Sequence, residues 1–318
     1  MDWDTFVSIR EIQVMAGLSV HSNIVRLYDA VLSTHGEYCL IYEYANQGSL
    51  ESYLDQRRLK YTNTENQPLL PDEQIRSFLS DALRGLEHIH ANGFFHRDIS
   101  PSNLLVSDGV CKVGDFTLAR PLFDSMTATN GATPLTTYIS KRWYRAPELL
   151  LRACFYGAAV DMYAMGCVAA ELYDSKARPI FPGGTEADQL HRIFCTLGTP
   201  TYVTWPEGVA LMTRLQIQHP IMDECLEDCL PSYLETTTID WFRCLLTLSP
   251  DRRLTASQAL GHNFLSSGQP GIRVLHTSAS SEPSDPSNQA ETKVESISKT
   301  KSRTPSVVHN PYKKARSR

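Results

Sequence analysis

The sequence predicts an α+β fold in which a small β-containing part is followed by a larger, mostly helical part. The first observation is an apolar helical stripe over 5–18, followed by two β-rich runs, 25–31 and 38–42, about a hairpin's distance apart. The second is an amphipathic pattern over 71–91, which is typical of a long helix packed on a core. The third is a turn signal at 108–109 between two short β-rich runs.

Each of these elements has a local reason. Pro71 and the two acids after it are typical of the first turn of a helix, and Gly93 can end that helix in the left-handed conformation. Asp108 followed by Gly109 favours a tight hairpin turn. A second apolar helix is expected from Asp161 onward. We expect short helices and turns over 179–231.

Composition excludes several classes of protein. The 318 residues are 42% hydrophobic and 20% charged, as in ordinary globular domains. The net charge is −5, but 293–318 carries eight basic residues and one acid, so the remainder holds about −12. We therefore expect a folded part that binds no nucleic acid. No apolar run approaches the roughly 20 residues of a membrane span, and there is no signal peptide, so a cytoplasmic protein is expected.

The eight cysteines are scattered among apolar neighbours. Cys225 and Cys229 are four residues apart, but no histidine pair lies near them in the sequence to complete a zinc site. We expect all eight to be buried free thiols in a reducing compartment.

The strongest chemical pattern is a His-Arg-Asp tripeptide that ends at Asp98 and is followed five residues later by Asn103. Phosphoryl transfer needs a carboxylate that accepts the proton of the attacking hydroxyl and an amide oxygen that holds a metal ion. Asp98 and Asn103 are the candidates for these two roles. Asp115 stands twelve residues further on and is followed by phenylalanine.

These patterns, followed by Arg-Ala-Pro-Glu at 145–148, resemble the catalytic lobe of eukaryotic protein kinases. The resemblance implies a protein-kinase-like fold with a partial small lobe at 1–45 and a complete helical lobe at 46–265. The tail at 266–318 is too polar to offset the entropy of ordering and is expected to be disordered. ATP and Mg²⁺ are the implied cofactors, with Asp115 as the implied second Mg²⁺ ligand beside Asn103. Proteins are the implied substrates, and the chain is expected to be a monomer.

By the same resemblance Glu11 would pair with an ATP-binding lysine. Glu43 and Ala45 would belong to the hinge that binds adenine, and Leu105 would lie beneath the adenine ring. A glycine-rich loop and the lysine-bearing strand cannot fit into the ten residues before Glu11. We therefore expect the first three strands of the small lobe to be absent from this sequence.

The resemblance also assigns regulatory and structural residues. Thr136 and Tyr138 occupy the T-x-Y position of mitogen-activated-type kinases, where an upstream kinase could add a phosphate of about −1.5 to −2 charge. Arg97 is the expected partner of that phosphate; the alternative is an unmodified polar loop. Glu148 and Arg253 are expected to form a buried ion pair. Asp161, the remaining structural candidate, would hold the backbone of the catalytic loop.

Within the kinases, the chain is most similar to the RCK family of male-germ-cell-associated, ciliary kinases in the CMGC group. That group carries an insert such as 179–231. The stretches that carry the closer resemblance are 134–140 (Pro-Leu-Thr-Thr-Tyr-Ile-Ser), 180–183 (Ile-Phe-Pro-Gly), 197–200 (Leu-Gly-Thr-Pro) and 205–208 (Trp-Pro-Glu-Gly). It implies phosphorylation of serine or threonine with proline after the target. It also adds the cilium or flagellum as a place of action, whereas the nucleus is suggested by the basic run Lys313-Lys314-Ala315-Arg316, for which a solvated basic end is the alternative.

Two departures from the family pattern are visible. Thr117 stands where the family has glycine, and a β-branched residue is costly at positive φ, so movement of the Asp115 segment is expected to be restricted. Ser100 stands where serine/threonine kinases have lysine, and Lys141 where they have threonine. One hypothesis is a positional exchange in which Lys141 supplies the cation and Ser100 the hydroxyl beside Asp98. The other is drift in a degenerating enzyme.

Two functional interpretations follow from the sequence. The first is an active protein serine/threonine kinase in which Asp98 is the base. The second is a catalytically impaired, pseudokinase-like binding platform, because the glycine-rich loop and the ATP-binding lysine are missing from this sequence.

Overall fold

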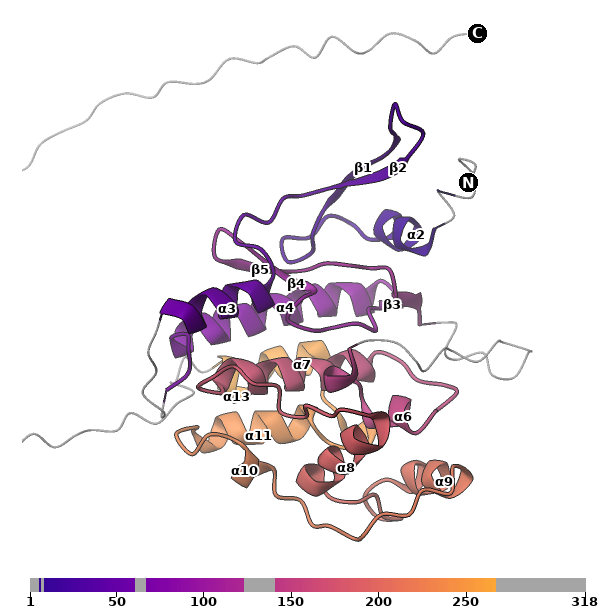
Figure 1. Cartoon of the computed structure of the whole chain (residues 1–318), viewed down its shortest axis with the longest axis vertical. Coiled ribbons are helices and arrows are strands. Elements are labelled where there is room, and N and C mark those ends of the chain that lie inside the picture. Colours follow the sequence, from indigo (N-terminus) through magenta and orange to yellow (C-terminus); the bar gives the residue numbers. More distant parts are fainter. Residues whose placement is uncertain (1–5, 7–8, 61–66, 123–140, 267–318) are drawn as a thin grey trace, which may run out of the picture. The chain divides into compact units, whose positions relative to one another are not determined.

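A short helix and a two-stranded hairpin form the N-terminal region of the computed structural model (Figure 1). The structure describes residue 6 and residues 9–60, 67–122 and 141–266; a second unit, 276–318, lies wholly outside these ranges. Helix α2 spans Arg10–Gly17, strand β1 Leu27–Leu32 and strand β2 Tyr38–Tyr42. The strands are antiparallel, and each of their residues keeps part of its surface exposed. The hairpin therefore contributes little core of its own.

Two helices follow the hairpin. Helix α3 spans Leu50–Lys60, and α4 spans Asp72–Ala91 with Pro71 at its N-cap. The buried residues of α4 recur at the spacing of one helix face; they are Ile75, Phe78, Leu79, Ala82, Leu83, Gly85, Leu86 and Ile89. After α4, Gly93 has a φ of 79°, the left-handed conformation that glycine adopts without a steric cost. The structure thus contains the long helix that the amphipathic pattern predicts.

Two small antiparallel sheets follow α4. Strand β3 (Phe94–Phe95) pairs with β6 (Arg120–Pro121), and β4 (Leu104–Ser107) pairs with β5 (Val110–Val113). The turn between β4 and β5 has positive φ at both Asp108 (50°) and Gly109 (78°), which is the turn type that favours this dipeptide. The segment between β3 and β4 is the one with the His-Arg-Asp pattern, so both of its ends are anchored in strands.

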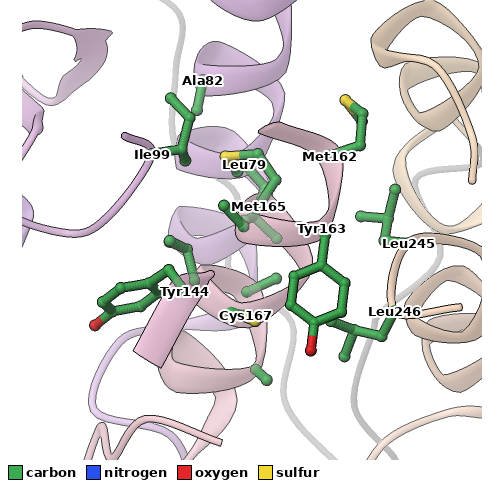
Figure 2. Close-up of a cluster of buried hydrophobic side chains, with 14 of the residues drawn as sticks. Leu79, Ala82, Ile99, Tyr144, Met162, Tyr163, Met165, Cys167, Leu245 and Leu246 are labelled. Atoms are coloured by element: carbon green, nitrogen blue, oxygen red, sulfur yellow. The ribbon is translucent and has the colours of Figure 1, made fainter. Parts of the chain in front are cut away.

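Helix α7 (Ala159–Tyr173) is the centre of the helical region. All of its residues except Ala159 are buried, and it contacts both α4 and α11 (Thr236–Leu245). Figure 2 shows Leu79 of α4, Met165 of α7 and Leu245 of α11 in one cluster of buried hydrophobic side chains. Because α7 is almost completely buried, a charged side chain on this helix would be costly without a partner within the protein.

The remaining elements complete the helical region around α7. They are η1 (Arg142–Tyr144), α6 (Pro147–Leu150), α8 (Glu186–Leu197), α9 (Pro206–Arg214), α10 (Leu226–Cys229), η2 (Pro250–Arg252), α12 (Ala256–Gly261) and α13 (Asn263–Ser266). The insert expected over 179–231 thus contains three short helices, α8 to α10. Within the described ranges, every helix is too short or too polar to cross a bilayer.

All eight cysteines are free, but the expectation that all are buried is wrong. Only Cys111 and Cys167 are buried, whereas the other six keep part of their surface accessible. The sequence pattern misled because an apolar neighbour in sequence can point to the opposite side of a helix.

Candidate active site

The loop with the His-Arg-Asp pattern is anchored by Asp161, a residue of the buried helix α7. Its carboxylate accepts hydrogen bonds from the backbone N–H of His96 (2.8 Å) and of Arg97 (2.7 Å), and it contacts His90 Nε2 (2.8 Å). Arg97 has a φ of 73°, which is costly for a residue other than glycine. The two N–H contacts offset this cost, so Asp161 fixes the direction in which the loop leaves β3.

The charge of Asp161 is stabilised although the side chain is buried. Burial alone would raise the pKa of Asp161, but the hydrogen bond and charge of His90 and the hydrogen bond from the backbone N–H of His96 outweigh it, so the pKa lies below its usual value. The loop is therefore anchored by a carboxylate that remains ionised near neutral pH.

The ring of His96 connects the catalytic loop to the segment that carries Asp115. Its Nε2 lies 2.9 Å from the carbonyl oxygen of Gly114, and its Nδ1 accepts the backbone N–H of Asp98 (3.3 Å). These partners assign the proton to Nε2, because a carbonyl can only accept. The ring also packs edge-on against Phe116 at 5.1 Å between ring centroids. Sequence reasoning gave His96 no separate role, although its place in the tripeptide was the available signal.

Asp98 and Asn103 are in direct contact. Asn103 Nδ2 donates to the carboxylate of Asp98 (2.8 Å) and to its carbonyl oxygen (2.7 Å). The backbone N–H of Gly114 donates to the carbonyl oxygen of Asn103 (2.9 Å), which joins Asn103 to the residue before Asp115. Asp115 itself is exposed, and its carboxylate accepts the N–H of Thr117 (3.2 Å). The structure thus brings Asp98 and Asn103 together and joins Asp115 to them through the backbone.

These groups fit a hard cation. Carboxylate and amide oxygens are the ligands that Mg²⁺ prefers. The amide nitrogen of Asn103 is the atom that donates to Asp98, so its amide oxygen is not needed for that contact.

Glu11, on α2, meets hydroxyl groups. Its carboxylate accepts the hydroxyl of Tyr42 (2.5 Å) at one oxygen and that of Thr117 (3.3 Å) at the other. Burial raises the pKa of the Tyr42 hydroxyl, and the bond to Glu11 adds to this effect. Glu11 is therefore linked to the Asp115 segment, a contact between residues 106 positions apart that sequence spacing could not indicate.

The strain expected at Thr117 does not occur. Thr117 is not among the residues with positive φ; the left-handed residue of this segment is Asp115, at 59°. The costly conformation thus falls on an aspartate, which tolerates it better than a β-branched residue does. Thr117 instead provides a hydroxyl that bonds to Glu11.

Glu43, a residue of the predicted hinge, forms an ion pair with Lys112 that the sequence did not indicate. Glu43 contacts Lys112 Nζ at 2.5 Å and also accepts the backbone N–H of Arg26 (3.3 Å). Lys112 lies opposite Leu105 in the β4–β5 pairing. The carbonyl oxygen of Ala45 accepts the N–H of Gly48, at the edge of a cavity of about 740 Å³ between residues 44–48 and α3. Lys112 therefore pairs with Glu43 through its side chain and with Leu105 through the strand register. Ala45 borders a neighbouring cavity.

Lys141 and Ser100 lie close to Asp98, but neither of their functional groups contacts its carboxylate. The backbone N–H of Lys141 donates to the Asp98 carboxylate (3.3 Å), while its ammonium lies 3.2 Å from both oxygens of Glu51. The buried hydroxyl of Ser100 pairs with that of Ser102 (3.0 Å). The ion pair with Glu51 is exposed on both sides and contributes at most about 1 kcal/mol, so Lys141 can leave it at little cost. The positional exchange stays a prediction.

Arg97 is part of a buried cationic cluster. Its guanidinium donates to the carbonyl oxygen of Leu118 (3.1 Å) and to the hydroxyl of Tyr156 (2.5 Å). Burial lowers the pKa of Arg97, and the charge of Arg120 adds to this lowering, although Tyr156 opposes it. Among the described residues, the buried Nε of Arg120 has no hydrogen-bond partner. The predicted phosphorylation positions, Thr136 and Tyr138, lie outside the residues that the structure describes.

Glu148 and Arg253 form a buried, two-pronged ion pair. The guanidinium donates to the two carboxylate oxygens at 2.6 and 2.7 Å, and both side chains are almost fully buried. Arg253 also donates to the carbonyl oxygens of Ala159, Thr247 and Leu248. Every donor thus has a partner, which is the condition under which a buried ion pair is tolerated. The pair connects α6 to the chain after α11 and to the start of α7.

Comparison with known proteins points to one family. A model of the protein kinase domain matches residues 3–265. Cyclin-dependent kinase F-3 of Oryza sativa subsp. japonica is 39% identical over 87% of this chain and 59% of its own length. The mouse serine/threonine-protein kinase ICK is 36% identical over 84% of this chain and 39% of its own length. Human serine/threonine-protein kinase MAK is 35% identical over 84% of this chain and 40% of its own length. The chain therefore spans roughly two fifths to three fifths of the length of these relatives.

Proposed function

Because this chain belongs to the protein kinase family, we propose that it transfers the γ-phosphate of ATP to serine or threonine hydroxyls of proteins. The observation that carries the proposal is the pair of hydrogen bonds from Asn103 to Asp98, on a loop anchored by Asp161. Family membership supports ATP and Mg²⁺ as cofactors and proteins as substrates. The resemblance at 134–140 and 205–208 to the RCK family supports targets that are followed by proline, and action in the cilium or flagellum; the basic run at 313–316 is the support for the nucleus.

Each residue of the site has a defined task in this proposal. Asp98 accepts the proton of the attacking hydroxyl, and the hydrogen bond from Asn103 keeps its carboxylate oriented. Asn103 and Asp115 would hold Mg²⁺, which supplies charge neutralisation for the transferred phosphoryl group. Glu43 and Ala45, with Leu105, would border the adenine.

The cationic cluster supports a regulatory role for the activation segment. The charge of Arg120 lowers the pKa of Arg97, so the two arginines are close enough to repel each other, and a phosphate on Thr136 or Tyr138 would find charge-assisted partners in them. An upstream kinase would be the partner that adds this phosphate.

A second candidate function is a binding platform that transfers no phosphate. The observation that favours it is Glu11, whose two oxygens accept hydroxyl groups of Tyr42 and Thr117 and therefore have partners that are not cations. In an active kinase this glutamate pairs with a lysine that contacts the phosphates. A binding platform would keep the helical region and its surface but would not transfer phosphate.

One experiment separates the two. The full chain and its Asp98→Asn variant are incubated with Mg²⁺, labelled ATP and two peptides that differ only in Ser-Pro against Ser-Ala. We expect the variant to lose about 10²–10⁴-fold of the transfer rate, because the proton acceptor is gone, and the Ser-Pro peptide to be preferred. Asp55→Asn, the same change at an exposed position of α3, should keep the wild-type rate.

The platform is the correct function if transfer by the wild type does not exceed that of Asp98→Asn and Mg·ATP does not raise the melting temperature. Ligand binding to the folded state must raise that temperature, so an absent shift at millimolar nucleotide excludes a nucleotide site of ordinary affinity.

A further inference from the structure

We propose that His191, Cys195 and His219 form a binding site for Zn²⁺ on the surface of the insert, away from the catalytic loop. Among the described residues, this is one of two groups of three His, Cys, Asp or Glu side chains whose ligand atoms all lie within 4.8 Å of one another. It is the one that combines two imidazoles with a thiol, and both are donors that suit Zn²⁺.

Two of the ligands come from one helix. His191 and Cys195 are four residues apart on α8, so both side chains stand on the same face. Their separation is short: Cys195 Sγ lies 3.8 Å from His191 Nδ1 and 3.5 Å from its Nε2. Neither side chain is buried, so a metal ion and its water can reach the site from solvent.

The third ligand is brought back by the loop that follows α9. His219 Nε2 lies 2.9 Å from His191 Nδ1, so the two ring nitrogens face each other across the position that a metal ion would occupy. In a tetrahedral site with Zn–N of about 2.0–2.1 Å and Zn–S of about 2.3 Å, N···N separations are roughly 3.3 Å and N···S roughly 3.6 Å. The observed 2.9 and 3.8 Å differ from these by a few tenths of an ångström, which side-chain rotation can supply.

His219 is already oriented as a metal ligand. Its other nitrogen, Nδ1, lies 2.8 Å from the carbonyl oxygen of Pro220. A carbonyl can only accept, so Nδ1 carries the proton and Nε2 presents its lone pair toward His191. An imidazole that donates to a backbone carbonyl from its non-ligating nitrogen is the arrangement that metal-binding histidines use.

The loop that carries His219 is held in place without the metal. The Thr199 hydroxyl donates to the carbonyl oxygen of Pro220 (2.7 Å), and the Thr199 N–H donates to that of Met222 (3.0 Å). The N–H of Cys225 donates to the carbonyl oxygen of Thr196 (2.9 Å), which binds the end of the loop to α8. Zn²⁺ would therefore meet a largely preformed site, whose remaining position a water molecule can fill.

Binding of Zn²⁺ displaces one proton and moves another. Cys195 binds as a thiolate, so its proton passes to solvent as Zn²⁺ enters. The proton on His191 Nδ1 moves to its Nε2, which leaves Nδ1 free to bind. With two nitrogens and one sulfur, the site discriminates against Mg²⁺ and Ca²⁺, which require oxygen ligands. It is therefore distinct in its chemistry from any Mg²⁺ site at Asn103 and Asp115.

The test uses the full chain and Zn²⁺ alone, with the affinity measured by competition against a chromophoric chelator. We expect one tightly bound Zn²⁺ per chain, and at least about a tenfold loss of affinity in Cys195→Ser and in His219→Ala. Cys39→Ser and His35→Ala change the same residue types in the β1–β2 hairpin and should bind as the wild type does. Cys244→Ser changes the second three-residue group, formed with Asp240 and His262, and should also leave the tight site intact.

A spectroscopic readout identifies the ligands. Co²⁺ in place of Zn²⁺ should show a thiolate charge-transfer band that disappears in Cys195→Ser, and X-ray absorption of the zinc form should show one sulfur neighbour at about 2.3 Å. Circular dichroism establishes that each variant is folded. If His219→Ala unfolds, the exposed His191→Ala replaces it. Binding that is absent, or that is equal in the wild type and the Cys195→Ser variant, overturns the proposal.

Discussion

The N-terminal region and the helical region each contain one hydrogen bond between a tyrosine and a glutamate, and the two bonds have different surroundings. Tyr42 donates to Glu11 at 2.5 Å beside strands in which no residue is fully buried. Tyr144 donates to Glu171 at 2.6 Å, and Glu171 lies on the almost completely buried helix α7. Bonds of the same kind and similar length thus sit in a thin hairpin and in a packed core.

The difference teaches how the site is supported. A two-stranded hairpin is marginally stable by itself, whereas a helix enclosed by other helices is stabilised by the burial of its apolar side chains. Asp98 and Asn103 are attached to α7 through Asp161, and Glu11 is attached to the hairpin through Tyr42. Asp98 and Asn103 are therefore attached to the well-packed helical region. Glu11, which would help to position a nucleotide, is attached to the thin N-terminal hairpin.

The largest effect on stability is expected from breaking the buried ion pair between Glu148 and Arg253 in the helical region. Replacing Arg253 with methionine leaves Glu148 as a buried charge without its partner, and we expect the free energy of unfolding to fall by about 3–5 kcal/mol. Urea denaturation followed by circular dichroism measures it. Arg243→Met removes an exposed arginine that pairs with Glu224 and Glu227, and should cost no more than about 1 kcal/mol. Equal losses in the two variants would contradict the rigid-core interpretation.

The second prediction concerns the pH dependence of stability that Glu171 causes, and it distinguishes this buried glutamate from Glu11. Burial raises the pKa of Glu171 to about 7, although the bond from Tyr144 opposes the rise. An acid whose pKa is higher in the folded state binds more protons there, so stability is full below about pH 4.5 and declines as the pH rises toward 7. The total decline is on the order of 3 kcal/mol.

Glu171→Gln removes this titration. We expect the loss of stability between pH 5 and pH 8 to be smaller in the variant than in the wild type, as measured by denaturant unfolding at both values. Gln56→Glu, which adds an acid at the surface of α3, serves as a control for charge alone. A pH profile of Glu171→Gln that matches the wild type would show that Glu171 is already ionised in the folded state.

The smallest effect is expected in the N-terminal region. Tyr42→Phe removes the hydroxyl that binds Glu11, and should lower the free energy of unfolding by about 1 kcal/mol. Its clearer signature is local: backbone amides of β1 and β2 should exchange with deuterium faster than in the wild type, while those of α7 should not change. Uniform acceleration across both regions would mean that the hairpin is not an independent opening unit.

Much of the fold could be predicted because its signals are local. The apolar spacing over 71–91 and the Asp108-Gly109 turn depend on neighbours along the chain, and α4 and the β4–β5 hairpin lie where they predict. The cysteines show the opposite case. Their exposure depends on which helix face meets the core, and Cys195 became a candidate metal ligand only because the chain returns to it 24 residues later at His219.

The sequence by itself determined the family and the order of the chemical groups, because the spacing from Asp98 to Asn103 and Asp115 is a property of the chain. Only the tertiary structure decided which atoms meet. The partners of Glu11, the ion pair between Glu43 and Lys112, and the contact of Lys141 with Glu51 join residues 31 to 106 positions apart. Such contacts arise from the packing of whole elements against one another, and no local pattern encodes where one element will meet another.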